Sequence, residues 1–182
     1  MRCICSGISG REDSVRDFII EKIRGYAEYS VDALGNLLVF KKGKNPAKNK
    51  VMLDAHMDEV GMMITHINSD GTLDFECVGG IDKRVMLGRP VTVGENKING
   101  VIGVKAVHMV SAAEKLNMPS AMYIDIGADT KEEAQKAVSL GDYACFKSEF
   151  VEFGDGLIKG KALDDRAGCA ILIDMIKSDL PY

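Results

Sequence analysis

Apolar positions near the amino terminus recur with the period of a helix. They run at helical spacing from Val15 to Tyr26, so we predict a helix over about residues 10–28. Ser9 and Glu12, just before this pattern, have the spacing of a capping box, in which a serine side chain bonds the first turn. The chain is therefore expected to begin its ordered part with an amphipathic helix.

The pattern then changes to that of strands. The stretch YSVDALGNLLVFKKG predicts two strands joined at Gly35-Asn36, a pair of residues typical of turns. After a polar loop, KVMLDAH at residues 50–56 is an almost continuous apolar run, as in strands buried inside a mostly parallel sheet. A helix followed by such a strand indicates an α/β unit.

The middle of the chain has a different pattern of apolar and polar residues. From Thr65 to about Phe153, short apolar runs are separated by glycine-based turn signals such as SDG, VGG and GENKING, which predicts a compact β-rich domain. One helix interrupts these strands, and Asp129 is expected to cap it. We therefore expect a separate domain inserted into the α/β unit.

A second helix is predicted after the segment GKALDD. Its buried stripe is expected to consist of apolar residues at helical spacing, namely Ala167, Ala170, Ile171, Met175 and Ile176. Together these elements predict an α/β core formed by residues 1–66 and 159–182, with a barrel-like, β-rich insert at residues 67–158.

Composition narrows the class of protein. Apolar residues make up 46% and charged residues 27% of the 182 residues, which is typical of a globular chain. The net charge of −4 and the lack of a basic stripe argue against nucleic acid as a partner. No apolar run reaches membrane-spanning length, and the start MRCICSGISGREDS lacks the apolar region of a secretory signal. We expect no membrane association.

The cysteines favour a reducing compartment. There are five, an odd number, and their spacing fits no disulfide framework or zinc knuckle. Cys3 and Cys5 form a C-x-C pair that is able to bind metal, but two reduced thiols are the commoner case. We predict a cytoplasmic protein.

Two acids and a histidine lie in the segment LDAHMDEVGMM. Residues two apart in a strand point to the same side, so Asp54, His56 and Asp58 are expected on one face, with Ala55 and Met57 on the other. Placing such groups in a buried strand is costly unless they are paired or hold a cation. A neutral imidazole can bind a transition metal while a nearby carboxylate orients its ring, although a hydrogen-bonded core histidine is the commoner case.

A second acidic motif, LDDRAG, stands at the start of the last predicted helix. Asp164 and Asp165 either cap that helix or provide a carboxylate that bridges two metal ions, oriented by the adjacent acid and Arg166.

These motifs carry a family resemblance over essentially the whole chain. The blocks GISGRE, DALGNLL, LDAHMDEVGMM, VGGID, GVIGVKAVH, YIDIGA and GKALDDRAG occur in this order. The chain resembles the forty-second family of metallopeptidases, the deblocking, tetrahedral and glutamyl aminopeptidases, whose members are often labelled endoglucanase or cellulase. The resemblance implies a zinc-peptidase core of the phosphorylase/hydrolase-like type, with an inserted β-rich domain that mediates dimerisation.

The resemblance also implies roles for individual residues. His56 ligates one metal, Asp58 supports that histidine as part of the catalytic machinery, and Asp164 bridges two divalent metal ions, zinc or cobalt. A cis peptide joins Asp164 to Asp165. The implied reaction removes amino-terminal residues from peptides, in homo-oligomers whose dimers assemble into dodecamers.

Several expected parts of that family's site are not found in this sequence. The general-base glutamate and the remaining metal ligands come later in family members, and His66 and His108 do not replace them. We therefore expect an amino-terminal portion of the enzyme that is inactive alone. Two alternatives remain at this point: an oligomerisation or binding module only, and an endoglucanase. The second is disfavoured because sugar-stacking aromatic residues are scarce, with no Trp, five Tyr and six Phe.

Overall fold

The computed structural model describes residues 6–45, 48–104 and 122–181, and it divides the chain into two compact units. The first, here called the core unit, contains residues 1–59 and 149–182, and the second, the barrel unit, contains residues 60–148. The expected insert, 67–158, is therefore displaced at both ends. The barrel unit starts earlier because Gly61–Ile67 is a barrel strand, and it stops earlier because its last strand ends at Phe146.

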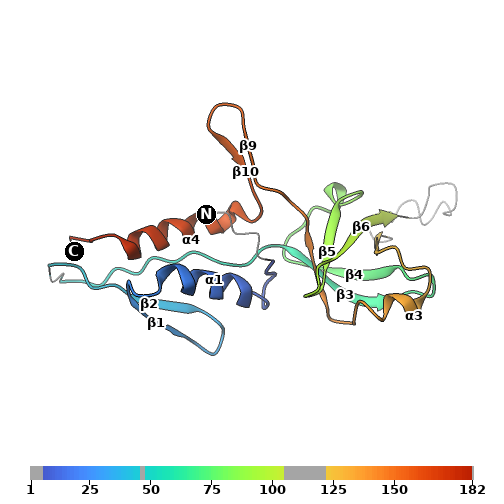
Figure 1. Ribbon diagram of the computed structural model, residues 1–182, viewed down its shortest axis with the longest axis horizontal. Coiled ribbons are helices and arrows are strands. Elements are labelled where there is room, and N and C mark those ends of the chain that lie inside the picture. Colours follow the sequence, from blue (N-terminus) through green and yellow to red (C-terminus); the bar gives the residue numbers. More distant parts are fainter. Residues whose placement is uncertain (1–5, 46–47, 105–121, 182) are drawn as a thin grey trace. The chain divides into compact units, whose positions relative to one another are not determined.

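The barrel unit is a closed barrel in the order β3-β4-β7-β6-β5-β8, with β8 pairing back onto β3 (Figure 1). Every neighbouring pair is antiparallel. Its strands are β3 (Gly61–Ile67), β4 (Leu73–Val78), β5 (Pro90–Val93), β6 (Ile98–Val104), β7 (Met122–Asp125) and β8 (Tyr143–Phe146). The predicted β-rich, barrel-like domain is thus confirmed. A short 3-10 helix, η1 (Lys83–Val85), lies between β4 and β5.

The interior of the barrel is filled by apolar residues that alternate along the strands. Met62 and Ile64 of β3 and Ile124 of β7 are at most 1% exposed. Gly103 leaves room for an aromatic ring, because a Cβ atom there would come within 2.7 Å of the Tyr123 ring. The barrel unit therefore has a hydrophobic core of its own.

The helix predicted near residue 129, α3 (Lys131–Ala134), is capped by Thr130 and not by Asp129. The Thr130 side chain accepts a hydrogen bond from the amide of Glu133, and the Glu133 carboxylate accepts one from the amide of Asp129. The predicted cap was wrong by one residue, because it is the Thr130 hydroxyl that reaches an amide of the first turn, that of Glu133.

The described residues of the core unit form two helices and two antiparallel hairpins. They are α1 (Asp13–Ile23), β1 (Glu28–Val31) with β2 (Leu37–Phe40), β9 (Val151–Phe153) with β10 (Leu157–Lys159), and α4 (Leu163–Lys177). Side chains of α1, β2, α4 and the segment around Ala55 share one apolar core, and Figure 1 shows that segment running along both helices. The unit has the mixed helix and strand content of a partial α/β core.

The expected buried strand at residues 50–56 is extended chain without strand pairing in the described structure. The segment makes a single parallel bridge at its end, between Ile8 and Glu59. Val51 and Met52 are more than 80% exposed, at 81% and 86%. A strand requires hydrogen-bonding partners at its edges, and the described residues offer one bridge, so the prediction of a sheet strand was wrong here. The side chains of this segment alternate between two faces as predicted, because Ala55 and Met57 pack into the core while His56 faces outward.

The two predicted helices of the core unit also needed correction. α1 is shorter than residues 10–28, because Gly25 has a φ of 83° just beyond its end. On α4 the buried residues are Arg166, Cys169 and Ile173, whereas Ile171 is 62% exposed. The predicted stripe was wrong for Ala167 and Ile171, which are exposed, whereas Ile176 packs against the core as predicted. The inner face is marked by a buried arginine, which sequence patterns count as polar.

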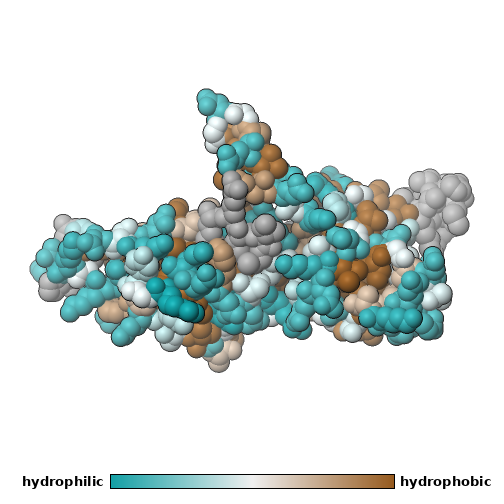
Figure 2. Space-filling model, in the orientation of Figure 1, coloured by the Kyte–Doolittle hydropathy of each residue, from teal (hydrophilic) through white to brown (hydrophobic). Residues whose placement is uncertain are grey.

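The hairpin β9–β10 carries exposed apolar side chains, and Figure 2 shows apolar surface on it. They are Val151, Phe153, Leu157 and Ile158.

Among the residues described here, no helix combines the length and apolar character needed to cross a membrane.

Candidate functional site

His56 lies between two carboxylates. Its Nδ1 atom is 2.8 Å from Oδ1 of Asp58, and its Nε2 atom is 3.0 Å from Oδ1 of Asp164. The first contact comes from the same extended segment, and the second comes from the start of α4. The structure therefore brings three of the predicted site residues together, all within the core unit. The group is open to solvent, since the Asp164 side chain is 95% exposed.

The two contacts of His56 cannot both be ordinary hydrogen bonds of a neutral ring. A neutral imidazole carries one N–H, and an ionised carboxylate only accepts. If Nδ1 donates to Asp58, then Nε2 and Oδ1 of Asp164 face each other as two lone pairs across 3.0 Å. A proton between the two atoms, or a cation shared by them, stabilises that arrangement.

The protonation of His56 and Asp58 follows from these contacts. Partial burial lowers the pKa of His56, but the hydrogen bonds to Asp164 and Asp58 and their negative charges outweigh it, so the pKa lies above 6.5. The hydrogen bond from Ser9 is the main reason that the pKa of Asp58 is lowered, with a further contribution from His56. Asp58 is thus an anionic acceptor for the Nδ1–H group.

Ser9 is a site residue that the sequence pattern did not identify. Its hydroxyl donates to Oδ2 of Asp58, the oxygen that His56 does not contact. The predicted capping box was wrong: α1 has no side-chain cap, and Glu12 accepts instead from the amide of Gly10. Ser9 and Glu12 have the spacing of a capping box, but the Ser9 hydroxyl bonds Asp58, 49 residues along the chain.

The adjacent acids of the DDR motif have separate tasks. Asp165 Oδ1 accepts from the amide of Gly168 at 3.0 Å and so caps the first turn of α4. A Cβ atom on Gly168 would lie 2.5 Å from that oxygen, so the close approach requires glycine. The Asp164–Asp165 peptide bond is cis, the geometry that the family resemblance implies. With Asp165 as the cap, the Asp164 carboxylate is left to face His56.

A buried ion cluster lies beneath these residues. Oε1 of Glu59 is 3.3 Å from Nζ of Lys161 and 3.5 Å from Nη2 of Arg166, and each of the three side chains is at most 8% exposed. Arg166 Nε also donates to the carbonyl of Met57 at 3.0 Å. The cluster ties the segment that carries His56 to the helix that carries Asp164. Sequence reasoning noticed Arg166 but missed Glu59 and Lys161, whose neighbours are distant in sequence.

Comparison with known proteins identifies the family. The profile of the M42 glutamyl aminopeptidases matches residues 35–179, most of the chain. The chain belongs to the M42 family. The match includes all three residues of the His56 group, so their convergence is a feature of an M42 chain.

Relatives support this assignment. A protein of Acetivibrio thermocellus named as a candidate aminopeptidase is 45% identical over 94% of this chain and 50% of its own length. The lysyl aminopeptidase of Pyrococcus furiosus is 31% identical over 88% of this chain and 48% of its own length. This M42 chain therefore spans about half the length of the relatives it matches.

Solved structures give the same result. The TET1 peptidase of Pyrococcus horikoshii, described as assembling into a tetrahedron or a large octahedral shell, is 41% identical with a TM-score of 0.83. That match covers 96% of this chain and 53% of the other. A Thermotoga maritima structure named endoglucanase is 40% identical, with a TM-score of 0.84, over 98% of this chain and 54% of the other. The endoglucanase label expected from the resemblance thus occurs among M42-like structures.

The residues present fit part of a metal site. His56 and Asp164 offer a nitrogen and an oxygen, the donor atoms that zinc prefers. Within residues 6–45, 48–104 and 122–181, no group of three or more His, Cys, Asp or Glu side chains is arranged to hold a metal ion. This M42 chain therefore brings together two ligand atoms, fewer than a closed zinc site uses.

The other candidate residues lie apart from this group. Asp54 is exposed on the extended segment, and His66 is exposed on β3 of the barrel unit. His108, Cys3 and Cys5 lie outside the described residues. No role in the site is assigned to Asp54 or His66.

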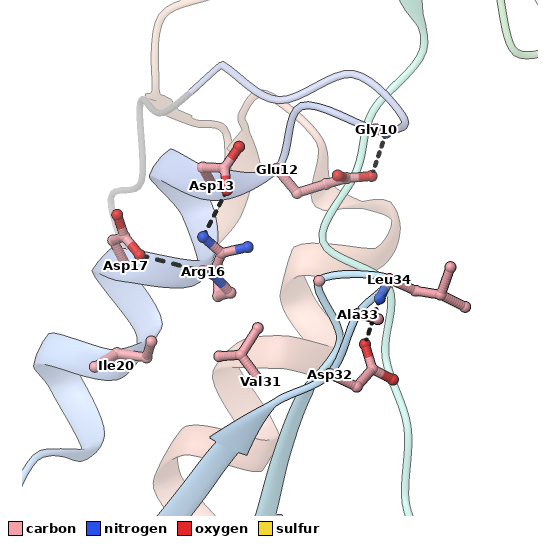
Figure 3. A pocket seen from close by; sticks show the side chains of 11 residues that line it. Gly10, Glu12, Asp13, Arg16, Asp17, Ile20, Val31, Asp32, Ala33 and Leu34 are labelled. Carbon is pink, nitrogen blue, oxygen red and sulfur yellow. Dashed lines mark hydrogen bonds and ion pairs between the residues drawn. The ribbon is translucent and has the colours of Figure 1, made fainter.

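An open pocket of about 490 Å³ lies between the start of α1 and the turn of the β1–β2 hairpin (Figure 3). Its charged lining is mainly acidic, and its one arginine, Arg16, contacts Asp13 at 2.5 Å and Asp17 at 3.7 Å. None of the three residues of the His56 group lines it, so the pocket is separate from the candidate site.

Proposed function

We propose that this chain provides part of the active site of a metal-dependent aminopeptidase. His56 and Asp164 bind a divalent cation, and Asp58 orients His56. The observation that carries the proposal is the approach of Nε2 of His56 and Oδ1 of Asp164 to 3.0 Å while Asp58 occupies Nδ1. A neutral imidazole held this way presents a lone pair toward a carboxylate, the arrangement that a shared cation stabilises.

The chemistry of such a site divides between metal and protein. A bound divalent ion, zinc or cobalt, lowers the pKa of a water molecule and so provides a nucleophile for peptide hydrolysis. The residues of this chain orient the site: Asp58 holds the His56 ring, Asp165 caps α4, and the Glu59 cluster fixes the two segments together. A bridging role for Asp164 between two ions is part of the proposal, as are peptide substrates with free amino termini.

The site favours this activity over glycoside hydrolysis. A glycosidase uses two carboxyl groups on either side of a sugar, one of them as a proton donor. Here Asp58 and Asp164 contact the two nitrogens of one imidazole, and the pKa of Asp58 is lowered, which opposes a donor role. We therefore do not extend the endoglucanase name of the Thermotoga protein to this chain.

We also propose that the chain forms homo-oligomers through the barrel unit. Support comes from the assemblies described for the Pyrococcus horikoshii peptidase. A cytoplasmic location is proposed as well, because the five cysteines are odd in number and their spacing fits no disulfide framework. Light scattering tests the assembly, and a strictly monomeric species at high concentration would contradict it.

Cobalt titration of the 182-residue chain, followed by visible absorption, tests the proposed metal site. We expect weak binding that is lost in His56→Gln and in Asp164→Asn, because each removes one of two ligand atoms. His66→Gln is the matched control, since that exposed histidine lies on β3. Any cleavage of an amino-acid nitroanilide is expected to need added zinc or cobalt.

Two results would overturn this proposal. One is cobalt binding that is as strong in His56→Gln as in the unmodified chain. The other is nitroanilide cleavage that continues after complete chelation of metal.

A further inference from the structure

The carboxylate of Asp58 is held from both sides. One oxygen contacts Nδ1 of His56 at 2.8 Å, and the other accepts the hydroxyl hydrogen bond of Ser9. A carboxylate with only one of these contacts is free to rotate about its terminal torsion, which has a broad preference. With both contacts, its plane is fixed relative to the imidazole ring.

The backbone that carries Ser9 is itself anchored. Ile8, its neighbour, is fully buried and forms the parallel bridge to Glu59. The amide of Glu59 donates to the carbonyl of Gly7 at 2.9 Å, and the amide of Gly7 donates to the Glu59 side chain at 3.1 Å. The Ser9 hydroxyl is therefore placed by the fold, next to Asp58.

The Ser9 hydroxyl does not cap the helix that follows it. The N-cap residue of α1 is Glu12, three residues after Ser9, and α1 has no side-chain cap. Ser9 donates its hydroxyl hydrogen bond to Asp58. The hydroxyl therefore serves the His56 group and not the first turn of α1.

We propose that Ser9 is a positioning residue for His56, acting through Asp58. By fixing the Asp58 carboxylate, its hydroxyl holds His56 in the tautomer that carries hydrogen on Nδ1 and leaves the Nε2 lone pair directed toward Asp164. This inference deepens the proposed metal-binding role of His56 and rests on it for the effect on metal affinity. The tautomer itself is a property of the chain without metal.

Nitrogen NMR of histidine-labelled protein, at alkaline pH where the imidazole is neutral, measures the tautomer directly. His56→Gln assigns the His56 resonances. We expect Ser9→Ala to lower the ratio of the Nδ1–H to the Nε2–H form by about fivefold, the equivalent of about 1 kcal/mol for one hydrogen bond. Ser9→Thr, which keeps the hydroxyl, is expected to retain the ratio.

Ser178→Ala is the matched control, because the Ser178 hydroxyl donates to the carbonyl of Asp174 at the far end of α4. A folded Ser9→Ala protein with an unchanged tautomer ratio would overturn the inference. If Ser9→Ala does not fold, Ser9→Cys, with a much weaker donor of similar size, is measured in the same way and decides the result.

Zinc affinity separates this inference from the proposed function. We expect Ser9→Ala to weaken zinc binding by the factor by which it lowers the fraction of His56 in the Nδ1–H form. If the unmodified chain binds no zinc, the proposed function fails while the tautomer result still stands. If zinc binds but the tautomer ratio does not respond to Ser9, the positioning role fails alone.

Discussion

At the scale of single residues, the site is a chain of contacts in which each polar group limits the next. Ser9 contacts Asp58, Asp58 contacts His56, and His56 faces Asp164. Asp165 lies beside Asp164 in the chain but bonds the helix amide of Gly168. Adjacent acids that look equivalent in the sequence therefore differ in function, because one is used by the backbone and the other is not.

The buried ion cluster gives a prediction at this scale. Replacing Glu59 by Gln removes the carboxylate that neutralises Lys161 and Arg166, and all three side chains are almost fully buried. Removing one partner of a buried ion pair costs about 3–5 kcal/mol, so we expect a loss of that order in the free energy of unfolding.

Urea denaturation measures this loss, and Glu28→Gln, an exposed position on β1, is the control. A change below about 0.5 kcal/mol in Glu59→Gln, the size expected for surface positions, would show that the cluster does not stabilise the fold.

At the scale of elements, α4 connects the site to the core. Its amino-terminal end carries Asp164 and the cap Asp165, and one face packs Cys169 and Ile173 against α1 and the His56 segment. The same helix thus positions a functional carboxylate and buries apolar surface, so its rotation about its own axis affects both.

That rotation can be checked with two isoleucines two residues apart. Ile173 is 6% exposed in the core and Ile171 is 62% exposed. We expect Ile173→Ala to lower the free energy of unfolding by about 2–5 kcal/mol, through lost burial and the cavity left behind. Ile171→Ala is expected to change it by less than about 0.5 kcal/mol.

Urea unfolding of the two variants side by side measures the difference. Equal losses, or a larger loss for Ile171→Ala, would mean that the helix face predicted from the sequence pattern is the buried one after all.

At the scale of the whole molecule, the chain consists of two units with separate cores. The buried apolar residues of the barrel unit lie between Met62 and Ala144, and those of the core unit come from both ends of the chain. Each unit therefore buries its own apolar surface, as expected when one domain is inserted into another.

This division predicts that residues 60–148 fold when expressed alone. The barrel is closed by the β8–β3 pairing inside that range, so excision breaks no strand pair of the barrel. We expect a β-type circular dichroism spectrum and a cooperative thermal transition. A spectrum of unfolded chain without a transition would contradict the independence of the barrel unit.

The sequence by itself determined the kinds of element and the main site candidates. Short apolar runs between glycine-based turns predicted the β-rich unit, helical patterns predicted the flanking helices, and the motifs identified His56, Asp58 and Asp164 as candidates. Local signals suffice for these because helix and strand periods arise from backbone geometry within a few residues.

Only the tertiary structure decided which partner each polar group has. Ser9 bonds Asp58 across 49 residues and His56 meets Asp164 across 108, so no local spacing records either contact. The buried Arg166 contacts Glu59 and Met57, which are distant in sequence. The division of the chain at Val60 likewise depends on the pairing of β3 with the distant strand β8. Hydrogen bonds and ion pairs form with whatever the fold brings near, and that is set by packing of the whole unit.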